Sequence, residues 1–162
     1  METEAARVRA LVWGDDEAIG ERAIARAAEL PEPDAKRILR DALADVDLDV
    51  AIRWSALLEL RDLGDFEPIA GALADPRQDC TVRSESICAL VTVRDDRWDA
   101  YLRAALVDDS PEIRRAGLRA VGRANRRDLV DAVAAVADQD TKRLIRWRAK
   151  RVARSLARVD GG

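Results

Sequence analysis

DSPEIRRAGL, residues 109–118, is the stretch that decides the fold: an acidic start is followed by an aliphatic residue, an arginine and a small residue. The core of this phrase returns as IRWSA at 52–56, VRSES at 82–86 and IRWRA at 145–149. Its arginines, Arg53, Arg83, Arg114 and Arg146, are 30, 31 and 32 residues apart. A fixed period in this range is typical of one supersecondary unit that stacks on copies of itself. The phrase therefore predicts a repeat fold.

Each copy of the phrase opens a helix, because apolar or small residues recur at i, i+4, i+5 and i+8. Acidic or hydroxyl residues precede these stripes and are suited to cap the helix N-termini. The stripes are Ile52/Ala56/Leu57/Leu60, Val82/Ser86/Ile87/Leu90 and Ile113/Gly117/Leu118/Val121, with an N-terminal copy at Ile19/Ala23/Ile24/Ala27 in which Gly20 replaces the arginine. A second helix follows in each copy, with expected core positions Leu39/Leu43, Ile69/Leu73, Leu102/Leu106 and Ala132/Val136.

The repeat predicts an all-α fold of about ten helices in one domain, residues 1–162. Its parts would be an N-terminal capping half-repeat at 1–15, repeats at 16–45, 46–75, 76–108 and 109–138, and a C-terminal capping helix at 139–162. The recurring pattern Asp-x-x-Ile/Val-Arg-x-x-Ala/Ser/Gly-Leu resembles the HEAT-like repeats of the phycobilisome-lyase type. That resemblance implies an armadillo-like helical protein, a right-handed α–α superhelix (solenoid) of about four to five helical hairpins.

The composition indicates a folded, highly charged protein: 48% of the residues are apolar and 36% are charged. No apolar run approaches the roughly 20 residues that span a bilayer, so we expect no membrane insertion. The first residues lack the basic start and apolar core of a secretory signal, so we expect a cytoplasmic protein. Scarce Lys, Asn and Phe beside abundant Ala, Arg, Asp and Val point to a GC-rich bacterial or archaeal genome.

Catalytic motifs are nearly absent from the sequence. There is no His, which excludes an imidazole base, a His-ligated metal and a serine–histidine dyad. Two cysteines cannot supply a structural zinc site unaided, and no Gly-rich phosphate loop is present. We expect Cys88 to be a small core residue, and Cys80, at a helix start, to be the only thiol with a candidate function. The chain is therefore expected to be no enzyme and to hold no cofactor or metal.

The repeated arginines, Arg53, Arg83, Arg114 and Arg146, allow two interpretations. They could form a row that binds anions, or a structural ladder that pairs with acidic residues in the turns between repeats. The acidic pairs suited to such a ladder are Asp45/Asp47, Asp75/Asp79, Asp108/Asp109 and Asp138/Asp140. We favour the ladder, because interfaces between neighbouring repeats hold a solenoid together.

Positions where one copy departs from the others are the candidates for binding a partner. Trp98 and Tyr101 stand where other copies have polar or turn residues, and two aromatics three apart share a helical face. They would form a recognition patch on the concave surface, or cover an apolar gap beside a longer turn. Trp54 and Trp147 share one repeat position, and each would rest on its neighbour or contact a partner.

The charge is unevenly distributed: residues 1–109 carry 14 basic and 25 acidic side chains, whereas residues 110–162 carry 14 and 6. The basic half contains two helical stripes that could neutralise phosphates and bind nucleic acid. Alternatively, they form a solvated cap, because Lys150 stands where the preceding copies have Leu or Ile. The stripes are Arg115/Arg119/Arg123 and Arg146/Lys150/Arg154/Arg158.

The resemblance implies a non-enzymatic protein-interaction scaffold, which would bind a partner protein through its concave helices and oppositely charged ends. The alternative is a nucleic-acid-binding protein, related in fold to the alkylpurine DNA glycosylases that are built from HEAT-like repeats. No catalytic residue of those enzymes can be matched to this chain. A lyase-like or chaperone role is implied only by the family resemblance. The sequence does not fix the oligomeric state or the identity of the partner.

Overall fold

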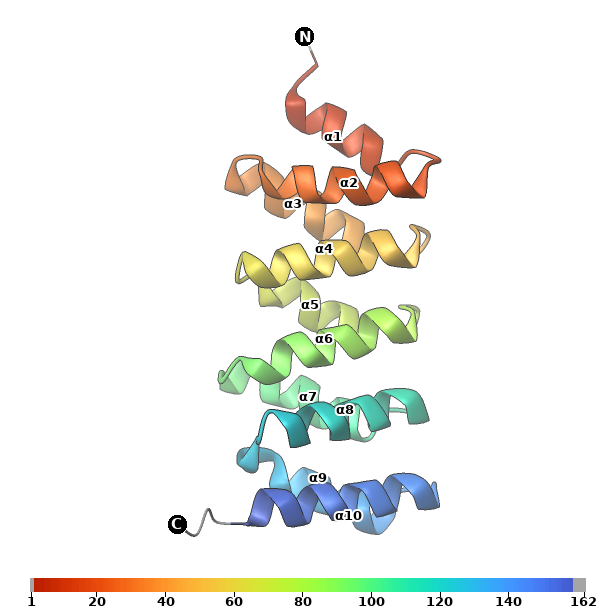
Figure 1. Cartoon of the computed structure of the whole chain (residues 1–162), viewed down its shortest axis with the longest axis vertical. Helices are drawn as coiled ribbons and strands as arrows, with labels where there is room; N and C mark the ends of the chain where they lie inside the picture. Colours follow the sequence, from red (N-terminus) through yellow and green to blue (C-terminus); the bar gives the residue numbers. More distant parts are fainter. Residues whose placement is uncertain (1, 159–162) are drawn as a thin grey trace. The chain divides into compact units, whose positions relative to one another are not determined.

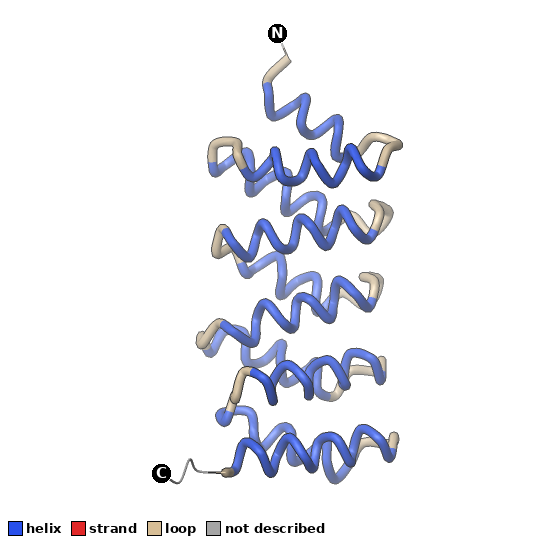
Figure 2. The backbone as a smooth tube through the Cα atoms, viewed as in Figure 1, coloured by secondary structure: helices blue, strands red, loops and turns tan. Residues whose placement is uncertain are grey.

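The computed structural model describes residues 2–158, which form ten α-helices and two 3₁₀ turns and contain no strand (Figures 1 and 2). The all-α class and the number of helices expected from the repeat are confirmed. The α-helices are α1 (Glu4–Val12), α2 (Glu17–Ala28), α3 (Glu32–Ala44), α4 (Val50–Asp62), α5 (Phe66–Ala74), α6 (Cys80–Thr92), α7 (Asp99–Leu106), α8 (Pro111–Arg123), α9 (Val130–Gln139) and α10 (Arg143–Ala157), and the 3₁₀ turns are η1 (Asp96–Trp98) and η2 (Arg127–Leu129). None of these helices combines the length and the apolar character needed to cross a membrane.

The chain divides into two compact units, residues 1–86 and 87–162, and α6 contains the boundary. In the first unit, α2 and α4 pack side by side, and α1, α3 and α5 follow one another in a second layer (Figure 1). In the second unit, α8 packs beside α10, and α7 beside α9. We call the pairs α2/α4 and α8/α10 the first-helix layers, because each of these helices opens a repeat.

The apolar stripes expected for the first helices of the full repeats are buried, which confirms their register. The buried residues are Ile52, Ala56, Leu57 and Leu60 in α4, Val82, Ser86, Ile87 and Leu90 in α6, and Ile113, Gly117, Leu118 and Val121 in α8. Transfer of such side chains from water drives the stacking of the helices, at about 25 cal/mol per Å² of apolar surface.

Two expected core positions were wrong by one residue. Ile19 is 41% exposed, and Gly20 takes the buried position beside it. In α9, Ala132 is half-buried and Val133 is buried. Val133 has the larger apolar side chain of the two, so its burial removes more apolar surface from water.

Gly20 allows α2 to approach α4 closely. A Cβ atom at this position would lie 2.5 Å from Cδ1 of Ile52 and 3.3 Å from its Cγ1. Ile52 is itself buried on α4, so a larger residue at position 20 would have to displace it. The absence of an arginine from this copy therefore has a packing reason.

Residues with positive φ follow two of the first helices, α4 and α8. Gly64 has φ 69° after α4, and Asn125 has φ 50° after α8. In each turn the next amide bonds back to the helix: Asp65 N–H donates to Leu60 O at 2.8 Å, and Arg126 N–H donates to Val121 O at 3.1 Å. This left-handed end satisfies helix carbonyls and directs the chain into the second helix.

Both cysteines lie on α6 and are exposed. Cys80 is the first residue of the helix, as its position in the repeat indicated. The expectation that Cys88 lies in the core was wrong. Residues 86, 87 and 89–91 of α6 are buried, and position 88 is the one in this turn that faces solvent.

Candidate functional site

In the first unit, the repeated arginine Arg53 is buried and bonded to neutral groups. Its Nε–H donates to the Leu48 carbonyl at 3.0 Å, and its Nη1–H donates to Oε1 of Gln78 at 2.6 Å. The Gln78 side chain in turn donates to the Leu43 carbonyl at 2.7 Å. The acidic partner expected for Arg53 is thus replaced by an amide. Arg83 also bonds to backbone, since its Nε–H donates to the Leu73 carbonyl at 2.9 Å.

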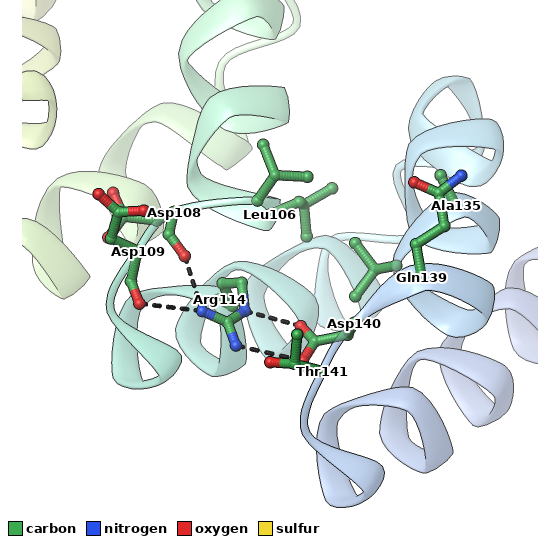
Figure 3. Close-up of a pocket in the computed structure, with 10 residues that line it drawn as sticks. Leu106, Asp108, Asp109, Arg114, Ala135, Gln139, Asp140 and Thr141 are labelled. Atoms are coloured by element: carbon green, nitrogen blue, oxygen red, sulfur yellow. Dashed lines mark hydrogen bonds and ion pairs between the residues drawn. The ribbon is translucent and has the colours of Figure 1, made fainter.

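In the second unit, Arg114 pairs with an acidic residue in the turn between repeats (Figure 3). Its Nε–H and Nη2–H donate to the two Asp140 carboxylate oxygens at 2.7 and 3.1 Å. Its Nη1–H donates to the carbonyls of Asp108 at 2.7 Å and Asp109 at 3.1 Å. The hydrogen bond from Arg114 is the main cause that lowers the pKa of Asp140 below its ordinary value. Arg146 continues the pattern one repeat later, because its Nη1–H donates to the Asp140 carbonyl at 2.6 Å.

Arg114 also lines a cavity of about 410 Å³ between the ends of α7 and α9. Its donors already point to two carbonyls and one carboxylate, so the guanidinium has little capacity left for an external anion. The carboxylates of Asp108, Asp109 and Asp140 around it would repel one. The residues around this cavity therefore connect neighbouring repeats, and the cavity is a poor site for an anion.

Of the aromatic pair expected to anchor a partner, Trp98 is buried and Tyr101 is half-buried. Trp98 is only 5% exposed and ends the turn η1. Its ring lies 6.3 Å from the half-buried ring of Tyr101, centroid to centroid, and the guanidinium of Arg97 lies 5.1 Å from the Trp98 centroid. A Trp this deeply buried fills the core beside the longer turn, so it cannot serve as an exposed hot spot.

Arg126 is not part of the repeated phrase. Its side chain holds the turn after α8 in place. It is buried, its Nη1–H donates to the Val91 carbonyl at 3.3 Å, and its guanidinium pairs with Asp99 and Asp128. In the first unit the corresponding turn carries Asp65, which accepts from Arg40 Nε–H at 2.6 Å. At this turn, the buried member of the ion pair is thus acidic in the first unit and basic in the second unit. An unpaired buried charge is costly, which explains why both residues have partners.

A basic concave surface of the second unit lies between α8 and α10. It is a cavity of about 410 Å³, and no acidic residue is among those that line it. Within residues 2–158, none of its four arginines makes a hydrogen bond or ion pair with a carboxylate. We call it the α8–α10 groove; its charged and aromatic residues are Arg119, Arg123, Arg148, Arg151 and Trp147.

A smaller cavity of about 180 Å³ extends this groove toward the N-termini of the two helices. Arg148 lines both cavities, and Arg115 and Lys142 add two more cations. The smaller cavity has one carboxylate, that of Glu112, which accepts from the Ser110 hydroxyl at 3.0 Å. A strip of mainly positive charge therefore follows the whole length of the α8/α10 pair.

The equivalent groove of the first unit has the opposite charge. Between α2 and α4, a cavity of about 270 Å³ is lined by Glu21 and Glu59 and by a single arginine, Arg22. Burial, and then the nearby charge of Asp62, raise the pKa of Glu59 above its ordinary value. A basic groove is consequently a property of the second unit and does not follow from the repeat itself.

The structure separates the basic residues that the sequence grouped. Arg115, Arg119 and Arg123 line the strip, whereas Lys150, Arg154 and Arg158 are exposed and line neither of its cavities. Arg146 is half-buried and bonded to backbone.

The sequence prediction missed Arg148 and Arg151. Their spacing of three from each other, and of four from Leu144 and Trp147, is the signal that could have placed them on one face of α10. Of the two tryptophans that share a repeat position, Trp147 lines the α8–α10 groove, and Trp54 is 40% exposed without lining the α2–α4 cavity.

No protein-family model matches this chain, and no curated protein matches it at a significant level.

Proposed function

We propose that this chain is a non-enzymatic helical-repeat module that binds nucleic acid along the α8–α10 groove. The observation that carries the proposal is the cluster of four groove arginines without carboxylate partners among the described residues. The repeat pattern supports the further proposal that the whole chain is a HEAT-like solenoid. We also propose that the protein works in the cytoplasm.

Charge and geometry favour phosphate as the ligand. Like charges gathered in one groove repel each other, so an anion that bridges them relieves a cost that the folded protein otherwise bears. Guanidinium groups bind phosphate oxygens through paired N–H donors, and arginine is the side chain of choice for this contact. A strip with cations on both helices, and with one carboxylate at its end, is suited to a chain of phosphates.

A second candidate partner is an acidic, amphipathic protein segment, which keeps the scaffold function implied by the family resemblance. Leu144 is 60% exposed and Trp147 is 51% exposed, and both lie beside groove arginines. Apolar side chains between cations could hold such a segment. The concave surface carries less support, because its expected anchor Trp98 is buried.

The test measures binding of fluorescently labelled oligonucleotides by anisotropy over a series of salt concentrations. The groove variant carries Arg119→Glu, Arg123→Glu and Arg148→Glu. The matched control carries Lys150→Glu, Arg154→Glu and Arg158→Glu, which changes the net charge equally outside the groove. Circular dichroism checks that both variants fold.

We expect the groove variant to lose binding and the control to retain most of it. For a single strand the slope of log K against log salt should be about −3, since four phosphate contacts contribute about −0.7 each. Absence of binding by the unaltered protein at low salt would refute the proposal. Equal losses in the two variants would refute the assignment to the groove.

A further inference from the structure

Trp147 has a setting that no other tryptophan of the chain shares. It is 51% exposed and lines the α8–α10 groove, and the guanidinium of Arg151 lies 4.9 Å from its ring centroid. Half of the residue thus remains open to solvent even though an arginine lies over the ring. The helix pair holds the ring at the wall of a basic groove.

The remaining tryptophans are used by the fold or lie in different surroundings. Trp13 donates from Nε1 to Asp45 Oδ2 at 2.8 Å and has Arg9 over its ring at 4.5 Å. Trp98 is buried. Trp54 is exposed, but the cavity between its helix and α2 is lined by two glutamates. The structure therefore gives Trp147 no packing role comparable to that of Trp98.

An exposed aromatic ring among cations is suited to a nucleobase. Proteins that bind single strands combine a positively charged groove, which follows the phosphates, with aromatic side chains on which bases stack. Every base has a π-face, so such a site tolerates any sequence. Arg151 would add a cation–π contact to the stack of ring and base.

The groove geometry favours a single strand over a duplex. Axes of packed helices lie about 8–10 Å apart, so the floor between α8 and α10 is much narrower than a double helix. In a duplex, moreover, each base face is covered by its neighbours, whereas a single strand can turn a base toward a protein ring. Trp147 could therefore stack with a base only when the strand is unpaired.

We propose that the α8–α10 groove binds single-stranded nucleic acid and that Trp147, backed by Arg151, is its base-stacking platform. This inference rests on the proposed nucleic-acid function and adds the strand type and the residue that selects it. The groove arginines hold the phosphates, and Trp147 contributes the contact that a duplex cannot make.

The experiment compares Trp147→Ala, Trp147→Phe and the control Trp54→Ala, with an oligothymidylate of about 20 nucleotides, which exceeds the site size of a single groove. A duplex of the same length and poly-glutamate are the comparison ligands. We expect Trp147→Ala to weaken oligothymidylate binding by about 5- to 150-fold, the loss of one base stack. The salt slope should not change, because the phosphate contacts remain. Trp147→Phe should recover most of the affinity, and Trp54→Ala should behave as the unaltered protein.

The tryptophan emission gives an independent readout, because a stacked base quenches the ring it covers. Quenching by oligothymidylate should be lost in Trp147→Ala and kept in Trp54→Ala. If Trp147→Ala binds normally while the groove variant does not, the stacking inference is wrong and the nucleic-acid function stands. If the unaltered protein binds no oligonucleotide at low salt, both are wrong. Equal weakening of poly-glutamate and oligothymidylate binding in Trp147→Ala would overturn the inference in favour of an acidic protein segment.

Discussion

Replacing Arg114 by methionine is expected to lower the free energy of unfolding by about 3 kcal/mol. The change removes four hydrogen bonds: two to the Asp140 carboxylate and one each to the carbonyls of Asp108 and Asp109. The Arg114 and Asp140 side chains are 11% and 3% exposed, so the carboxylate would be left with little water to replace its partner. Removing one member of a buried pair costs about 3–5 kcal/mol. We expect the lower end, because Asp140 keeps the hydrogen bond from the Lys142 amide at 2.7 Å.

Urea unfolding followed by circular dichroism measures this loss, and Arg115→Met is the matched control. Arg115 is the next residue along α8, is exposed and makes no ion pair within residues 2–158, so the same substitution should change stability by no more than about 0.5 kcal/mol. A shift of the urea midpoint at constant slope would indicate a change in stability alone. Equal effects of the two substitutions, or a loss below about 1 kcal/mol for Arg114→Met, would refute the structural role of Arg114.

The same pair predicts a pH dependence with a definite sign. The hydrogen bond from Arg114 lowers the pKa of Asp140 in the folded protein relative to the value of 3.8 for an unperturbed Asp. The stabilisation is therefore complete above the unfolded pKa and is lost as the pH falls through the folded pKa. In Arg114→Met the main cause of that depression is gone, so its stability should fall less steeply with acid below pH 3.8 than that of the unaltered protein.

Two further predictions test the packing of each unit. Gly20→Ala should destabilise the protein by about 1–2 kcal/mol by overpacking against Ile52 Cδ1. Adding Ile52→Val, which deletes that atom, should recover part of the loss in a double-mutant cycle of unfolding free energies, and strict additivity would contradict the contact. Trp98→Ala should cost about 3–5 kcal/mol by leaving a cavity, whereas Trp147→Ala should cost no more than about 0.5 kcal/mol. Similar thermal midpoints for these two variants would contradict the different burial of the two rings.

The sequence was sufficient to predict the helices, because their register depends on local periodicity. Ile113 and Val121 are buried because they lie on the same face of a 3.6-residue helix, whatever that face packs against. The errors occurred where the helical period did not decide burial. Val133 is buried in place of the smaller Ala132, and Cys88 lies at a solvent-facing position of an otherwise largely buried turn.

The candidate site was only partly predictable from the sequence, because residues of two different helices form it. The stripe on α8 was visible in the sequence, and Arg119 and Arg123 do line the groove. On α10, the sequence predicted the stripe Arg146/Lys150/Arg154/Arg158, whereas the groove receives Arg148 and Arg151. Which face of α10 meets α8 depends on how the two helices pack. Similarly, the sequence does not distinguish Trp98 from Trp147, since burial of Trp98 depends on a turn outside the helical pattern.

The arginines that repeat and those that do not have different roles in this chain. Arg53, Arg83 and Arg114 recur with the period of the fold. Arg53 and Arg114 donate to carbonyls of the turns between helices, and Arg83 donates to a carbonyl in the last turn of α5, so their hydrogen bonds hold the chain turns in place. Arg119 and Arg148 have no such bonds within residues 2–158. A positive charge that the fold does not use remains available to a ligand. Since the equivalent groove between α2 and α4 is lined by glutamates, stacking of the helices does not require the groove arginines. We therefore expect the groove arginines to be required for binding and not for folding. Reversing their charge should abolish binding of an oligonucleotide without changing the stability, whereas loss of Arg114 should lower the stability.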